Sequence, residues 1–190
     1  DVYIYVIIIW KLETTSTAKH DLLLEVCMAA KYEGESLTRF NPKYPEIYSG
    51  STMCTMLARS FADIGDIVRG RDIFRGNDEE KKKEMKENKL KEIFKKIHSG
   101  LSKNGAKDYY QGFKLREDWW YANRQEIWKA ITCDDDKKLA SASYFRPTCD
   151  SVDGKGPSQA HDKCTCNNGD VPTYFDYVPQ YLRWFEEWAE

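Results

Sequence analysis

The chain has 190 residues, of which 41% are hydrophobic and 14% aromatic, so it is long and apolar enough for a single domain with a buried core. Its 29 basic and 31 acidic residues give a formal net charge of −2. This balance excludes an overall positive field of the kind that draws a protein to nucleic acid or to anionic membranes. A polyanionic partner therefore has to meet a local patch of positive charge.

The first segment, from Tyr3 to Trp10, is the only strongly apolar run in the sequence. It is far shorter than the roughly 20 residues that span a bilayer, so we do not expect a membrane anchor. It also lacks the basic start and the small-residue cleavage site of a signal peptide. Its β-branched residues favour a strand or a sticky terminus, and any export signal is expected outside this chain.

Two helices are predicted in the first part of the chain. From Asp21 onward, apolar residues recur at helical spacing, and we expect Gly34 to end this helix. After a loop that contains Pro42 and Pro45, a second helix is predicted to end at Gly70. Its buried stripe follows an i, i+4, i+7, i+11 pattern and consists of Leu57, Phe61, Ile64 and Val68.

Two more helices are predicted in the middle of the chain. The most charged stretch, from Glu79 to His98, still has an apolar face in its second half, so we expect a helix that ends before Gly100. Its first half is expected to be solvated. A fourth helix is predicted from Arg116 to Thr132, because Trp120, Trp128 and other apolar residues share one side.

The stretch from Asp134 to Val171 has no sustained periodicity and contains clusters of glycine, proline, serine and asparagine. Because unstructured loops of more than roughly 15 residues are uncommon in compact domains, we expect disulfides to hold it. Pro179 is predicted to open a last helix with a stripe formed by Tyr181, Leu182, Phe185 and Trp188. We expect one core, which contains Leu57, Phe61, Ile64, Val68, Trp120, Trp128, Leu182 and Phe185.

The six cysteines form an even set, which favours an oxidising compartment and disulfides. We expect every one to be bridged, in a connectivity that the spacing leaves open: Cys27, Cys54, Cys133, Cys149, Cys164 and Cys166. Cys164 and Cys166 should have different partners, because a bridge between them would be strained. The weaker alternative is a zinc site that adds His161 to Cys149, Cys164 and Cys166, but C-x-C spacing is a poor match for structural zinc sites.

Other chemistry-bearing residues have a structural interpretation. Asp63 and Asp66 share a helix with Arg59 and Arg69, and we expect a polar network there rather than a catalytic acid pair. No catalytic constellation is present, so we expect neither an enzyme nor a cofactor or metal. Helical spacing favours packing in the core over stacking on sugar rings for the tryptophans Trp119, Trp120, Trp128, Trp184 and Trp188.

Several sequence blocks resemble one known family. Residues 57–70 read LARSFADIGDIVRG, and 118–124 read DWWYANR. They are joined in the same order by 128–133, WKAITC, and 174–188, YFDYVPQYLRWFEEW. Upstream, HDLLLEVC and AAKYEG add to the match. These blocks resemble the Duffy-binding-like (DBL) alpha domains of the Plasmodium falciparum erythrocyte membrane protein 1 family.

The resemblance implies a mainly α, helical-bundle fragment with long disulfide-held loops. Residues 12–190 would form part of the DBL domain, comprising the end of the first and part of the second subdomain, with the third subdomain absent. Residues 1–11 would be an atypical N-terminal segment. Membrane attachment would then depend on parts of the parent protein outside this chain.

In function, the resemblance implies a host-cell adhesion module of a variant surface antigen, displayed on the infected erythrocyte. It would bind erythrocyte or endothelial receptors in rosetting or cytoadherence, and antibodies would recognise it. Heparan sulfate, complement receptor 1 and blood-group sugars are the family's candidate partners, and nucleic acid is not among them. The alternative is a structural part of a larger head domain with no binding of its own.

The candidate contact site is a run of lysines within Glu79 to His98. The stretch contains eight lysines and five glutamates, so its net charge is +3. The lysines are Lys81, Lys82, Lys83, Lys86, Lys89, Lys91, Lys95 and Lys96. The structural interpretation is a solvated helix face with i, i+4 ion pairs. The functional interpretation is a patch that binds sulfated glycans, because exposed ammonium groups attract sulfates without a shaped pocket.

Overall fold

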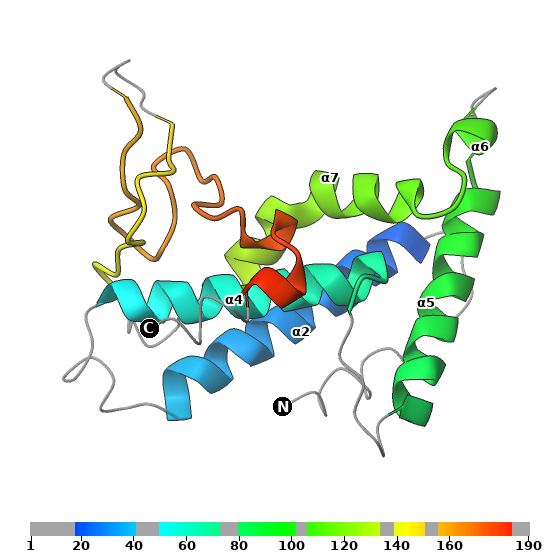
Figure 1. The fold of residues 1–190 in the computed structure, drawn as a ribbon, viewed down its shortest axis with the longest axis horizontal. Coiled ribbons are helices and arrows are strands. Elements are labelled where there is room, and N and C mark those ends of the chain that lie inside the picture. Colours follow the sequence, from blue (N-terminus) through cyan, green and yellow to red (C-terminus); the bar gives the residue numbers. More distant parts are fainter. Residues whose placement is uncertain are drawn as a thin grey trace.

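The computed structural model describes residues 18–40, 50–72, 80–101, 106–133, 139–150 and 156–183, so the apolar run at the start of the chain lies outside it. The described elements are α2 (Ala18–Phe40), α4 (Gly50–Arg69), α5 (Glu80–Ser99), α6 (Ala106–Tyr109), α7 (Lys114–Ile131) and the 3₁₀ helix η1 (Phe175–Tyr177) (Figure 1). The prediction of a mainly helical chain is confirmed. None of the described helices combines the length and apolar character needed to cross a membrane.

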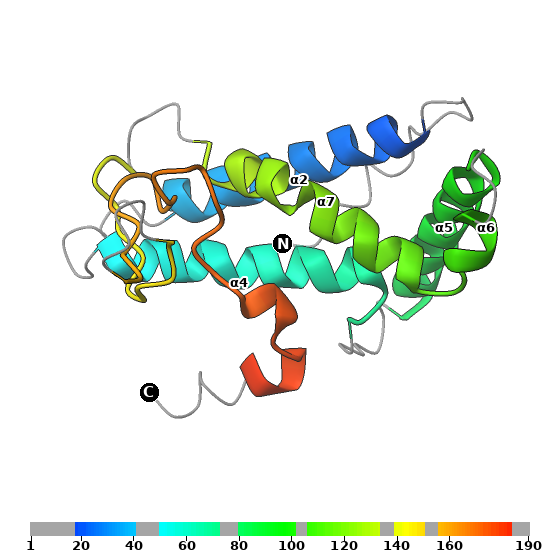
Figure 2. The same cartoon turned by 90° about the horizontal axis from the view of Figure 1, so that it is seen from above.

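Helices α2, α4 and α7 form the body of the molecule. α7 packs along α2 and also rests on α4, as Figures 1 and 2 show from two directions. α5 stands across one end of this layer and carries α6 beside it, while the irregular segments 139–150 and 156–174 gather at the other end. The two ends of the domain therefore differ: one is helical and the other is a loop structure.

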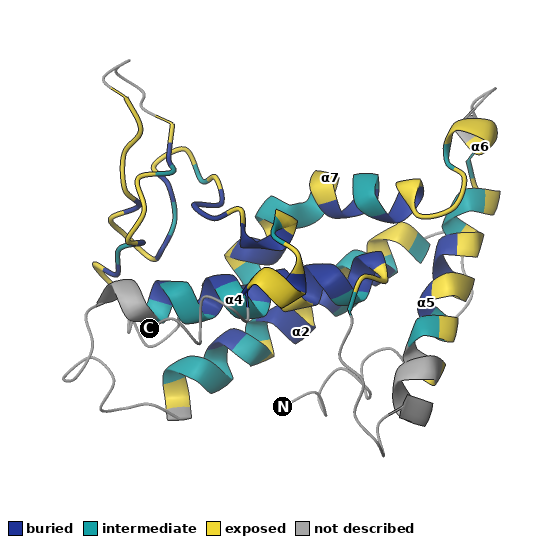
Figure 3. Cartoon of the chain, in the orientation of Figure 1, coloured by how far each residue is buried: buried dark blue, intermediate teal, exposed yellow. Residues whose placement is uncertain are grey.

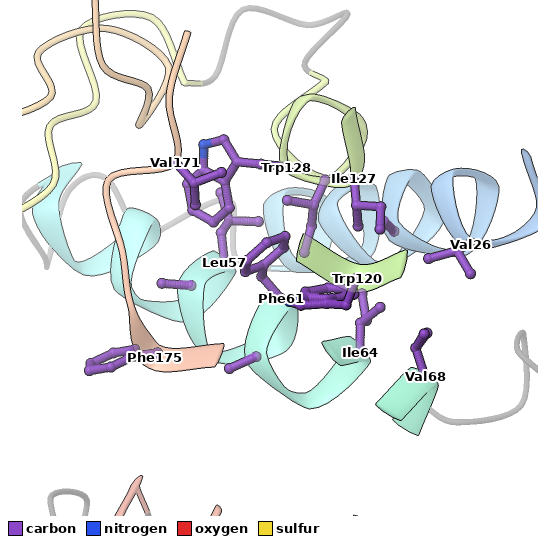
Figure 4. Packing of buried hydrophobic residues seen from close by; sticks show 14 of the residues in the cluster. Val26, Leu57, Phe61, Ile64, Val68, Trp120, Ile127, Trp128, Val171 and Phe175 are labelled. Carbon is purple, nitrogen blue, oxygen red and sulfur yellow. The ribbon is translucent and has the colours of Figure 1, made fainter. Parts of the chain in front are cut away.

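The core lies where α4 faces α2 and α7 (Figure 3). The predicted α4 stripe of Leu57, Phe61, Ile64 and Val68 is buried, with the ring of Phe61 centred 5.0 Å from Trp120 and 5.2 Å from Trp128 (Figure 4). Both tryptophans have no exposed surface. Six of the eight predicted core residues are thus confirmed.

The predicted ends of α4 and α5 are also confirmed. α4 ends at Arg69, and Gly70 follows with a φ of +73°, a left-handed conformation that favours glycine. The amide of Gly70 donates to the carbonyl of Ile67, and the amide of Arg71 donates to the backbone carbonyl of Asp66. α5 ends at Ser99, before Gly100.

The expected end of the first helix at Gly34 is wrong, since α2 continues to Phe40. A Cβ atom at Gly34 would lie 2.0 Å from the carbonyl oxygen of Ile131 in α7. Glycine is needed here because it has no side chain, which lets the two helix backbones approach each other. The residue therefore marks a crossing point of α2 and α7 rather than a helix end.

A buried charge network joins α4 and α7 to the segment around η1; it consists of Asp66, Arg69, Trp120, Arg124, Asp176 and Arg183. The carboxylate of Asp176 has no exposed surface. It accepts a hydrogen bond from the indole nitrogen of Trp120 at 2.9 Å and two from Arg124, at 2.9 and 3.1 Å. Both residues that donate these hydrogen bonds are on α7, so the carboxylate fixes η1 on that helix.

The second half of the network lies on α4. Arg69, whose side chain is fully buried, donates to Asp66 at 3.2 Å, to the carbonyl of Gly65 at 2.9 Å and to the carbonyl of Asp176. Arg183 donates to Asp66 and, at 2.9 Å, to Asp63. The predicted polar network around the two aspartates is therefore present, although Arg183 had not been expected in it.

This network corrects one expected core residue. A helical turn does start at Pro179, whose carbonyl accepts from the amides of Leu182 and Arg183. Leu182 is 43% exposed, however, because the charged side of the turn is the one that faces α4. Arg183 takes the inward position, so Leu182 is not part of the core. Phe185 and the last two tryptophans lie outside the described residues.

We predict that Gly34→Ala destabilises the domain in spite of alanine's better helix propensity. The added methyl group meets backbone of α7, which has no rotamer to change, so the unfolding free energy should fall by about 1–3 kcal/mol. Chemical denaturation measures this. Gly100→Ala is the control, since its Cβ would lie 3.5 Å from the nearest atom. Equal stability of the two variants would contradict the close approach.

A second prediction concerns Asp176→Ala. Removing this carboxylate leaves the guanidinium of Arg124 and the indole of Trp120 without their partner, which should cost about 3–5 kcal/mol of unfolding free energy. Asp108→Ala, at an exposed position on α6, should change stability by no more than about 0.5 kcal/mol. A loss at Asp176 as small as the control's would mean that the network is not a major source of stability.

Candidate functional site

The predicted lysine run lies on α5, whose buried side consists of Leu90, Ile93 and Phe94. Lys81, Lys82, Lys83 and Lys86 fall outside the described side chains. Among the others, Lys91, Lys95 and Lys96 are exposed and Lys89 is half-buried. The structure therefore places four of the eight predicted lysines.

These four lysines do not form one patch. At 3.6 residues per turn, Lys91 and Lys95 share a side of α5 with His98, whereas Lys89 and Lys96 point about 150° away. Lys89 lies toward α2: burial lowers the pKa of its ammonium group, and the carboxylates of Glu25 and Glu92 oppose that shift. The run is thus divided between two faces of the helix.

The face that carries Lys91 and Lys95 borders a groove of about 490 Å³, which we name the α5–α6 groove. It is lined by Lys91, Phe94, Lys95, His98, Tyr110, Gln111, Gly112, Phe113, Leu115 and Arg116. Among the described residues that line it, none carries a carboxylate. Aromatic rings and positive charges therefore meet in one concave surface.

One of these positive charges is neutralised within the structure. Arg116 is buried and donates to both oxygens of Glu87, at 2.8 and 3.2 Å. The ammonium of Lys91 lies 3.9 Å from Oε1 of the same carboxylate. Because the charge of Glu87 cancels that of Arg116, the net positive charge at the groove comes from Lys91 and Lys95. Both of these side chains are exposed.

The tryptophans give no sugar platform in the described part of the chain. Trp119, Trp120 and Trp128 are all buried, as their helical spacing predicted. The exposed aromatic residue at the groove is instead Phe113, which is 61% exposed and directly precedes α7. Sequence reasoning missed it, because a residue in a turn takes part in no periodic pattern.

The cysteines form two disulfides. Cys54 in α4 pairs with Cys164, and Cys149 pairs with Cys166, so the long loop is held covalently and the adjacent pair has different partners, as expected. The zinc alternative fails, because three of its four proposed ligands, Cys149, Cys164 and Cys166, are in disulfides. No cluster of metal-ligating side chains occurs among the described residues.

The expectation that all six cysteines are bridged needs correction, because Cys27 and Cys133 are free thiols. Gly34 is the residue of α2 that lies beside Ile131, and Cys27 precedes it by seven residues, about 10 Å along the helix axis. Cys133 follows Ile131 instead. A disulfide requires Cα atoms within about 7 Å, so these two thiols are too far apart along the helices.

The comparisons with known proteins agree with this architecture. The profile of the Duffy binding domain family matches residues 2–183. The chain therefore belongs to the Duffy binding domain family, whose members in the malaria antigen PfEMP1 are adhesion modules. No match is found among curated proteins.

Within this family, the resemblance to DBLα domains is confirmed by a solved structure. The chain is 44% identical, with a TM-score of 0.72, to the NTS-DBL1(alpha-1) domain of Plasmodium falciparum membrane protein 1 (PfEMP1) from the varO strain. The match covers 90% of this chain and 37% of that one.

Two DBLβ structures are also similar. A PfEMP1 DBLβ domain bound to human ICAM-1 is 31% identical, with a TM-score of 0.68, over 96% of this chain and 34% of that chain. The PfEMP1 IT4var13 DBLβ domain bound to ICAM-1 is 30% identical, with a TM-score of 0.60, over 90% and 37%. The chain thus spans about a third of the length of these relatives.

The free thiol of Cys27 yields a prediction. Burial, with a smaller contribution from the carboxylate of Glu126, raises the pKa of this thiol to about 11. At pH 8 only about 0.1% of it is then thiolate, the reactive form. Iodoacetamide should therefore modify Cys27 slowly in the native chain and rapidly in guanidinium with the disulfides intact. Peptide mass spectrometry distinguishes the sites, and rapid native labelling of Cys27 would refute the shift.

Proposed function

We propose that this chain is a host-cell adhesion segment that binds anionic glycans through the exposed lysines of α5. The observation that carries the proposal is the α5–α6 groove, where Lys91 and Lys95 border aromatic rings and no lining carboxylate is described. In a chain with a net charge of −2, a polyanion gains most from such a local concentration of positive charge. The proposal thus narrows the predicted run to one of its faces.

The family supports the general role. PfEMP1 DBL domains are extracellular adhesion modules, and the DBLβ relatives bind human ICAM-1. This relationship supports an extracellular position in a variant antigen on the infected erythrocyte, and we propose that the chain forms the end of the first and part of the second subdomain. Heparan sulfate, a sulfated glycan, fits the charge of the groove better than blood-group sugars, which carry no sulfate, or the protein complement receptor 1.

The second candidate is a structural segment of a larger head domain. Its support is that the chain spans about a third of the length of its structural relatives, which leaves most of such a domain elsewhere. The two functions differ in one measurable property, which is whether this chain alone is retained on heparin and on red cells. The adhesion function is favoured if the chain is retained on heparin and loses this retention when the charges of Lys91 and Lys95 are removed.

We therefore predict that Lys91→Glu with Lys95→Glu removes most of the retention on a heparin column. Retention of the unchanged chain should also fall steeply with salt, because exposed charges are screened over roughly 8 Å at physiological ionic strength. Circular dichroism should be unchanged, since both side chains are solvated.

The matched control is Lys129→Glu with Lys163→Glu, which makes the same change in net charge at exposed positions on α7 and in the far loop. It should keep most of the retention. Equal losses in the two double variants would mean that only total charge matters. Full retention in the α5 variant would exclude Lys91 and Lys95 as the contact.

A further inference from the structure

The α5–α6 groove has walls that are fixed by contacts within the chain. Nε2 of His98 donates to the carbonyl of Lys107 at 2.9 Å, which ties the end of α5 to α6. The ammonium of Lys114 lies 3.4 Å from the centre of the Tyr109 ring, and Tyr109 meets Tyr110 edge to face at 5.0 Å. These contacts of α6 support the turn that follows it, and this turn lines the groove from Tyr110 to Phe113.

Gly112 lies in the turn that lines the groove. Its φ of +62° is in the left-handed region, and a Cβ atom placed there would meet nothing within 4 Å. The next residue, Phe113, is 61% exposed although it precedes a helix whose following residues, Leu115 and Arg116, are buried. An exposed aromatic ring thus stands at the rim, above a floor of apolar side chains that includes Phe94.

The two lysine charges lie at the exposed edge of the groove. Lys91 and Lys95 are one helical turn apart, about 6 Å along the axis of α5, and both lie on the rim. Arg116 is held lower in the groove by its two hydrogen bonds to Glu87 and packs against Phe94, 5.2 Å from the ring centre. The two lysine charges are therefore on exposed side chains, and the buried lining consists of Phe94, Leu115 and the paired Arg116.

A sulfated pyranose has the complementary chemistry. Its C–H face is apolar and packs on an aromatic ring, while its sulfates project from the edge of the ring, where ammonium groups bind them. The volume of about 490 Å³ is within the roughly 300–1,000 Å³ of small-ligand sites and exceeds what a single simple anion fills. An acidic peptide would match the charge but would leave the ring of Phe113 without a matching face.

We infer that the α5–α6 groove is a subsite for a short sulfated oligosaccharide unit, with one sugar ring stacked on Phe113 and its sulfates bound by Lys91 and Lys95. This inference rests on the proposed function, because it assigns a defined position to one part of the same polyanionic glycan. It goes beyond charge attraction, since it requires an aromatic ring at residue 113.

The test uses a heparin-derived tetrasaccharide and isothermal titration calorimetry with the full chain. Phe113→Leu should weaken binding by roughly fivefold to tenfold, because it keeps apolar volume and loses the flat ring. Phe113→Tyr should restore it. Tyr121→Ala removes another exposed aromatic side chain, on α7, and should leave affinity unchanged. Thermal melts of each variant confirm that the fold is kept.

The outcomes separate the two hypotheses. If Phe113→Leu binds the tetrasaccharide normally while the Lys91 and Lys95 charge reversal still abolishes heparin retention, the subsite is refuted and the proposed function stands. If the charge reversal has no effect either, both are refuted. Competition by a glutamate peptide of equal charge, at equal concentration, would show that the groove recognises charge alone and would overturn the assignment to a sugar.

Discussion

The fold depends on the neutralisation of buried charge between α4, α7 and the segment around η1. Asp66 and Asp176 are both almost fully buried. Asp66 accepts hydrogen bonds from Arg69 on the same helix and from Arg183, and Asp176 accepts them from Arg124 of α7. A buried carboxylate without such partners is costly, so the three arginines and the two acids can be accommodated only together. The arrangement fixes the last described segment against both α4 and α7.

The sequence indicates much of the helical framework, because helix periodicity is a local property. The α4 stripe from Leu57 to Val68 is read correctly from spacing alone, and Gly70 is correctly placed after its end. The prediction for Gly34 is wrong, because a glycine can mark either a helix end or a point where two helices approach closely. Only the position of α7 distinguishes the two cases.

Long-range pairing explains the other differences. Leu182 has the spacing of a core residue, but Arg183 faces inward because it reaches Asp66, which lies 117 positions earlier in the chain. For the same reason the cysteine count predicts bridges but not that Cys27 would lie without a thiol partner in the α2–α7 interface. The candidate site was predicted in part: the lysines are evident in sequence, whereas Phe113 joins them only through the turn between α6 and α7.

The Cys54–Cys164 disulfide has a mechanical consequence for a chain under tension. The bond links residues 110 positions apart, so a force applied at the two ends of the described chain passes from α4 directly into the late loop. The intervening stretch, which contains α5, α6 and α7, lies outside this load path and cannot be extended while the bond is intact.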